Sequence, residues 1–180
     1  MAEHVLVKAT MKTMHRIKLT GAVLLLLSAA LPMSSCSHFE DAEGNRVTVA
    51  EGEAVPEGVQ KVVTYNYAFE DFDAAEAADW LLPAAFLWPL LVVGLLWRWS
   101  QGPVAVMLRL AEPVLLVGSA YLIAALVAWG ERPEAGAYVA FAALAIYAGA
   151  AVWEDVRRGR AWWQDRQAGL PPQASPTAAA

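Results

Sequence analysis

The sequence predicts an all-α membrane protein with three transmembrane helices and a small N-terminal extracytoplasmic segment that can form a β-hairpin. Hydrophobic residues make up 58% of the 180 residues and charged residues only 17%, which is not the composition of a soluble domain. The second half of the chain holds three long apolar runs, at residues 80–97, 104–129 and 136–153. Each run is long enough to cross a hydrocarbon core of about 30 Å as a helix.

Tryptophans support the same three spans independently of hydropathy. Indole rings prefer the headgroup region of a bilayer, so they collect where a helix enters or leaves the hydrocarbon. Trp88 is the exception, because it falls in the middle of the first predicted span. The tryptophans at the predicted boundaries are Trp80, Trp97, Trp99, Trp129 and Trp153.

The first 35 residues have the pattern of a secretory signal peptide. The basic region contains Lys8, Lys12, Arg16 and Lys18. The apolar run at 19–31 follows, with the length of a signal-peptide core but too short for a comfortable membrane span. Small residues come next, directly before the single cysteine of the chain, Cys36.

Met33, Ser34, Ser35 and Cys36 together resemble the lipobox of bacterial lipoproteins, in which an apolar residue and two small residues precede the modified cysteine. The resemblance covers residues 1–36 only. It implies cleavage of the signal peptide before Cys36, a diacylglycerol thioether on its sulfur and an acyl chain, such as palmitate, on the new N-terminus. The alternative is an uncleaved signal anchor, with Cys36 as an ordinary thiol and residues 19–31 as part of a fourth span.

Residues 36–79 are predicted to lie outside the membrane as a small polar segment. Alternating β-type runs at 46–50 and 60–67 predict the two strands of a hairpin. Asp73, with Glu76 three residues later, has the spacing of a capping box and predicts the start of the helix that enters the membrane at Trp80. Short loops at 98–103 and 130–135 separate the three spans, and residues 154–180 form a basic, partly disordered tail.

Arginines predict the orientation of the spans. Arg98 lies in the first loop and a cluster of arginines follows the third span, whereas Arg132 in the second loop is flanked by glutamates. The positive-inside rule therefore places the first loop and the C-terminal tail in the cytoplasm, and residues 36–79 outside. With three apolar spans, the expected location is the bacterial inner (cytoplasmic) membrane.

Arg109 and Glu112 are the charged residues of the second predicted span, and their i, i+3 spacing allows them to pair on one helix face. An intramembrane carboxylate is a functional-site hypothesis by default, because burying a charge in lipid is costly. A proton relay, a cation site and a clamp on another helix all fit this hypothesis. The structural alternative is that Arg109 snorkels to the cytoplasmic interface and Glu112 pairs with it.

Two further features indicate contacts of the helices and the tail. Gly136 with Ala140, and Ala145 with Gly149, have the small-xxx-small spacing that lets helices approach closely, either within this chain or against another protein. The tail carries a basic and aromatic patch that is expected to contact anionic lipid headgroups at the inner leaflet. That patch consists of Arg157, Arg158, Arg160, Trp162 and Trp163.

Enzymatic chemistry finds little support in the sequence. The sequence has no phosphate-binding loop, no dinucleotide fingerprint, no nucleophile elbow and no histidine pair for a metal, so no cofactor, no metal site and no catalytic residue are predicted. The expected function is that of an inner-membrane lipoprotein, a structural or accessory subunit of a larger membrane complex. Expected partners are membrane lipids and either another protein or further copies of the chain through the membrane helices, not nucleic acid. The alternative function is a small oligomeric transporter or channel component that uses Arg109 and Glu112.

Overall fold

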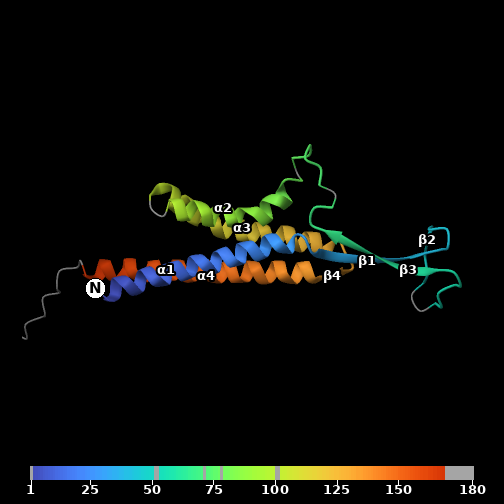
Figure 1. Cartoon of the computed structure of the whole chain (residues 1–180), viewed down its shortest axis with the longest axis horizontal. Helices are drawn as coiled ribbons and strands as arrows, with labels where there is room; N and C mark the ends of the chain where they lie inside the picture. Colours follow the sequence, from blue (N-terminus) through green and yellow to red (C-terminus); the bar gives the residue numbers. More distant parts are fainter. Residues whose placement is uncertain (1, 51–52, 71, 78, 100–101, 169–180) are drawn as a thin grey trace, which may run out of the picture.

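The computed structural model describes residues 2–50, 53–70, 72–77, 79–99 and 102–168. Helices dominate these residues: α1 (Ala2–Ser28), α2 (Leu81–Arg98), α3 (Pro103–Ala128) and α4 (Ala135–Ala168). A small sheet is formed by β1 (Pro32–Glu40), β2 (Arg46–Val47), β3 (Gln60–Tyr67) and β4 (Arg132–Pro133). Figure 1 shows the helices gathered in an elongated bundle, with the sheet extending from one end. The predicted mostly helical fold is confirmed, and a small sheet accompanies it.

Among the described residues, three helical segments are long and apolar enough to cross a membrane. These segments are Leu81–Arg98, Pro103–Ala128 and Ala135–Gln164, and they coincide with the three predicted spans. The tryptophans near their ends are exposed, as expected for side chains that lie at a membrane surface. Trp88, the exception in the sequence, is buried, and its indole nitrogen donates a hydrogen bond of 2.6 Å to the Ser119 hydroxyl.

Helix α1 is part of the same bundle and lies antiparallel to α4 (Figure 1). The two helices approach closely at Gly21, where a Cβ atom would lie 3.0 Å from the Ala143 carbonyl oxygen and 3.1 Å from the Tyr147 nitrogen. Leu25 packs in the core together with Ala140 of α4. The predicted signal segment is therefore a packed helix of the bundle in this structure.

Strand β1 is the centre of the sheet, and it corrects the predicted hairpin. β3 matches the predicted strand at 60–67, but its antiparallel partner is β1, with Glu40 opposite Gln60 and Ser35 opposite Tyr65. The other predicted strand, 46–50, is reduced to Arg46–Val47, which pairs with the end of β1. β1 lacks a clear alternation of apolar and polar residues. Its first half is instead buried between the sheet and the helices, at Met33, Ser34 and Ser35.

The predicted start of the helix that contains the first span is also wrong. Asp73 does not begin a helix: its carboxylate accepts a hydrogen bond of 2.9 Å from the Ala75 N–H in a turn, and α2 begins only at Leu81. An aspartate can stabilise a turn by the same backbone bond with which it caps a helix. At the other end, α4 continues past Trp153 to Ala168, so the first part of the predicted tail is helical. Residues 169–180 lie outside the described residues.

Candidate functional site

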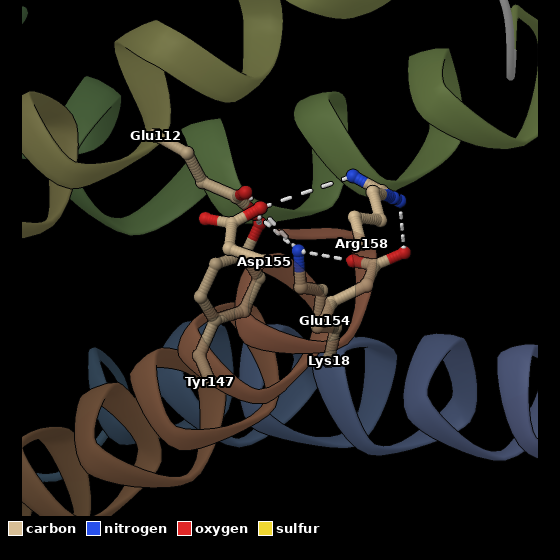
Figure 2. A network of polar contacts seen from close by, with 6 residues as sticks. All are labelled: Lys18, Glu112, Tyr147, Glu154, Asp155 and Arg158. Atoms are coloured by element: carbon tan, nitrogen blue, oxygen red, sulfur yellow. Dashed lines mark hydrogen bonds and ion pairs between the residues drawn. The ribbon is translucent and has the colours of Figure 1, made fainter. Parts of the chain in front are cut away.

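Lys18 of α1 brings three helices together inside the bundle. Its ammonium nitrogen lies 2.8 Å from Oε1 and 3.1 Å from Oε2 of Glu112 on α3, and 2.9 Å from Oε2 of Glu154 on α4. Figure 2 shows Lys18 between the two carboxylates, one from each neighbouring helix. The side chains of Lys18 and Glu112 are only 3% exposed, so this ion pair is buried within the chain.

The hydroxyl of Tyr147 completes the surroundings of Glu112. It donates a hydrogen bond of 2.7 Å to Oε1 of Glu112, and the ammonium of Lys18 lies 5.6 Å from the centre of the Tyr147 ring. Trp88 packs edge to face on that ring, with the ring centres 5.4 Å apart. Both oxygens of Glu112 are thus engaged by this chain's own donors, and aromatic rings exclude water from the pair.

Arg158 extends the network toward the end of α4. It pairs with Glu154 one helical turn earlier, and its Nη1 lies 3.9 Å from Oδ1 of Asp155 (Figure 2). The network is thus layered, with Glu112 buried, Glu154 partly exposed and Arg158 closer to the surface. Removing one member of a buried ion pair typically costs about 3–5 kcal/mol, because its partner is left as an uncompensated buried charge.

A cavity of about 710 Å³ opens beside this network. Its apolar lining residues are Leu19, Val93, Leu96 and Trp97. The other lining residues are charged or titratable: His15, Arg16, Lys18, Arg109, Glu154 and Arg158. The cavity therefore lies at the boundary between the apolar body of the bundle and its basic end.

A second group of polar contacts surrounds Cys36 at the opposite end of the bundle. The Ser37 hydroxyl and backbone N–H donate bonds of 2.7 and 3.1 Å to Oε2 of Glu131, and the Ser35 hydroxyl donates one of 2.7 Å to Glu134. The Ser37 donors hold the pKa of the Glu131 carboxyl below its ordinary value. The Cys36 sulfur lies 3.8 Å from the Trp129 carbonyl oxygen and 3.8 Å from the Asn66 side-chain nitrogen. These contacts connect β1 to the loop between α3 and α4.

The structure places the predicted residues Arg109 and Glu112 in one region of the bundle. Glu112 forms an ion pair with Lys18, which is 94 positions away in the sequence, and Arg109 lines the cavity next to that pair. Lys18 was predicted only as part of a basic signal region, and Tyr147 and Glu154 were not predicted as site residues. Lys18 directly precedes the apolar run at 19–31, and a charge at that position could have identified it as a candidate for burial.

The two predicted small-residue pairs of α4 have different surroundings. Ala140 is buried, and a Cβ at Gly136 would lie 2.7 Å from the carbonyl oxygen of Pro32, so this pair packs inside the chain. Ala145 and Gly149 are exposed, and no described atom lies within 4 Å of a Cβ built at Gly149. The first pair therefore serves internal packing, and the second faces outward.

The predicted basic and aromatic patch lies on the helical extension of α4. Arg160, Trp162 and Trp163 are exposed, and the two indole rings are stacked with their centres 6.0 Å apart. Arg166 lies over the Trp162 ring at 4.6 Å. Arg157 is partly buried, and Arg158 belongs to the buried network as well as to the patch.

The chain was compared with known proteins at the level of family, sequence and structure. No family model, no curated protein and no solved structure matches it.

Proposed function

We propose that this chain is a structural or accessory subunit of a larger complex in the bacterial inner membrane. The observation that carries the proposal is the outward-facing pair Ala145 and Gly149 on α4, a helix that buries Ala143 and Tyr147 inside the chain. Small residues at this spacing let a second helix come close, and close packing drives helix association in lipid. The contacts of Glu112 agree with a structural function, because they hold α3 against α1 and α4.

The experiment is co-purification of the tagged full chain from its own membranes in mild detergent, followed by native mass spectrometry. We expect a second protein at fixed stoichiometry, and we expect Gly149→Val to remove it, because a branched side chain would fill the space between the helices. Gly118→Val is the matched control, since Gly118 is an exposed glycine of α3 that also has no described atom near its Cβ. Recovery of the chain alone, or equal loss in both variants, would contradict the proposal.

We also propose that α1 is retained as a membrane helix, with both ends of the chain in the cytoplasm. From Lys18 the chain runs through about 15 Å of helix to Ser28 and then up to about 16 Å of extended chain to Met33. On α4 the distance from Glu134 to Glu154 is about 30 Å of helix. The segment from Lys18 to Met33 and the segment from Glu134 to Glu154 contact each other at both ends. The Glu134 N–H donates to the Met33 carbonyl at 3.1 Å, and Lys18 pairs with Glu154. The two segments therefore span about the same distance along the bundle. Residues 29–79 then lie outside the membrane.

The lipobox-like segment gives a different prediction, because cleavage before Cys36 would remove α1 and divide β1 at its middle. The intact mass of the chain from its native membrane distinguishes retention of α1 from cleavage before Cys36. A mass for residues 1–180 supports retention, whereas a mass beginning at Cys36 with added lipid supports the lipoprotein.

The alternative function, a transporter component, has a distinct signature. It requires Glu112 to exchange a proton or an ion, whereas both of its oxygens are bound by Lys18 and Tyr147. Ion flux in proteoliposomes that depends on Glu112 would favour transport over the structural function.

A further inference from the structure

We propose that the cavity beside Lys18 binds one anionic phospholipid, with the phosphate among the basic side chains and an acyl chain along the apolar wall. This site shares Arg158 with the basic and aromatic patch at the end of α4, and its other lining residues lie outside that patch. It also does not depend on the identity of a protein partner.

The shape and chemistry of the cavity fit an amphiphile. Its volume, about 710 Å³, exceeds what a few water molecules need, and its wall contains both apolar and charged side chains. Val93 and Leu96 of α2 are buried apolar lining residues, whereas the lining residues Leu19 and Trp97 are exposed. A ligand with a charged head and a hydrocarbon chain can therefore contact both the charged and the apolar side chains of the wall.

The charge balance around the cavity favours an anion. Among the side chains that the structure describes, the carboxylates of this region are Glu112, Glu154 and Asp155, and each takes part in the network of Figure 2. The cationic side chains that line the cavity outnumber these carboxylates: they are Arg16, Lys18, Arg109 and Arg158. A phosphodiester carries a single negative charge, which offsets the excess of one cation.

Two buried side-chain nitrogens beside the cavity also lack a hydrogen-bond partner among the described residues, and one of them, on the imidazole of His15, donates in one of the two tautomers. They are Nε2 of His15 and Nη1 of Arg158. Both residues line the cavity, and the His15 ring is held edge to face against Trp97, with the ring centres 5.6 Å apart. Buried donors normally have partners, and phosphate oxygens would provide them.

The position of the cavity favours a phospholipid over a soluble anion. Lys18 and Glu154 mark the ends of the apolar stretches of α1 and α4, so the basic residues of the cavity lie at the depth of a headgroup. Lipid headgroups reach that depth from the bilayer, and clusters of arginine and lysine at this level attract anionic lipids.

The test is native mass spectrometry of the purified full chain, delipidated and then titrated with phosphatidylglycerol or phosphatidylcholine of identical acyl chains. We expect phosphatidylglycerol to bind as a single molecule and about tenfold more tightly. Arg16→Gln should weaken this binding about fivefold, because Arg16 is an exposed wall residue whose loss the fold tolerates. Arg98→Gln is the matched control: an exposed arginine at the same end of the bundle that does not line the cavity.

Two further experiments ask whether the acyl chain contributes to binding and whether a soluble phosphate can replace the lipid. Leu19→Trp adds volume to the apolar wall and should reduce phosphatidylglycerol binding while circular dichroism shows an intact fold. Competition with glycerol phosphate tests the headgroup alone, and we expect little displacement. Equal affinity for the two lipids, equal effects of the two arginine variants, unchanged binding in Leu19→Trp, or full displacement by glycerol phosphate would each overturn the proposal.

Discussion

Lys18 shows how a single side chain can take a different role in the folded chain from the one its local sequence suggests. It ends a basic stretch typical of a signal peptide, yet in the bundle it is buried and bonded to Glu112 and Glu154. A buried ammonium is costly unless opposite charges and hydrogen bonds surround it. Two carboxylates and an aromatic ring supply those contacts, so the network depends on each of its members.

Glu112→Gln should destabilise the bundle by about 1–3 kcal/mol, because Lys18 loses its closest counter-charge and keeps Glu154. The measurement is the free energy of unfolding in mixed detergent micelles. The double variant Lys18→Met with Glu112→Leu is the control, and it should be more stable than Glu112→Gln since no buried charge remains. A fully stable Glu112→Gln protein would show that the ion pair does not hold the helices.

Gly21 lies at a close contact between α1 and α4, and its substitution tests that contact. Gly21→Val should destabilise the protein by about 1–3 kcal/mol, because its side chain would meet the backbone of α4 at Ala143 and Tyr147. Gly149→Val, on the open face of the same helix pair, should change the unfolding free energy by no more than about 0.5 kcal/mol. Thermal unfolding of both variants in one detergent makes the comparison, and equal midpoints would contradict the close packing of α1 on α4.

Among the elements, β1 connects the small sheet to the helical bundle. It pairs with β3 along its length, and with β4 at Ser34 and Ser35. Residues after β4 join the same contacts, since the Glu134 N–H donates to Met33 and its carboxylate accepts from Ser35. The sheet therefore fixes the α3–α4 loop to the end of α1, although these segments are far apart in sequence.

Low pH should weaken the contact between β1 and the α3–α4 loop at Glu131. Bonds from Ser37 lower the pKa of Glu131 below its ordinary value of 4.5, so the folded state favours the ionised carboxylate. The stabilisation is complete above that ordinary value, and it is lost as the pH falls through the lower folded pKa. We expect the hydrogen-exchange protection factor of the Ser37 amide to fall in this range. In Glu131→Gln, the protection factor of the Ser37 amide should be lower at neutral pH and should not fall further in acid. A fall in acid that persists in Glu131→Gln would show that another group causes it.

At the scale of the whole molecule, α1 and α4 form the longest pair of the bundle, with α2 and α3 packed beside them (Figure 1). α1 supplies the cation for Glu112, the close contact at Gly21 and core residues such as Leu25. The remaining helices would expose this surface, and a buried carboxylate, if α1 were absent.

A chain that begins at Cys36 should therefore fold poorly. We expect a clear loss of monodisperse protein and a lower unfolding midpoint than for the full chain, measured by size exclusion and thermal unfolding in the same detergent. Co-expression of residues 1–35 as a separate helix should restore part of the stability if the α1 contacts are responsible. Equal stability of the shortened and full chains would instead agree with removal of the segment as a signal peptide.

Features that depend on local composition could be predicted from the sequence. Apolar runs and their tryptophans predicted the three membrane-length helices, and alternation predicted β3, because solvent and lipid impose these patterns on each segment separately. Three other features follow from tertiary contacts: Glu112 pairs with Lys18, β1 is the partner of β3, and Gly136 is packed inside the chain whereas Gly149 faces outward. Each of these depends on which distant segment lies alongside, and β1 in particular is a strand because Met33 and its neighbours are buried between the sheet and the helices.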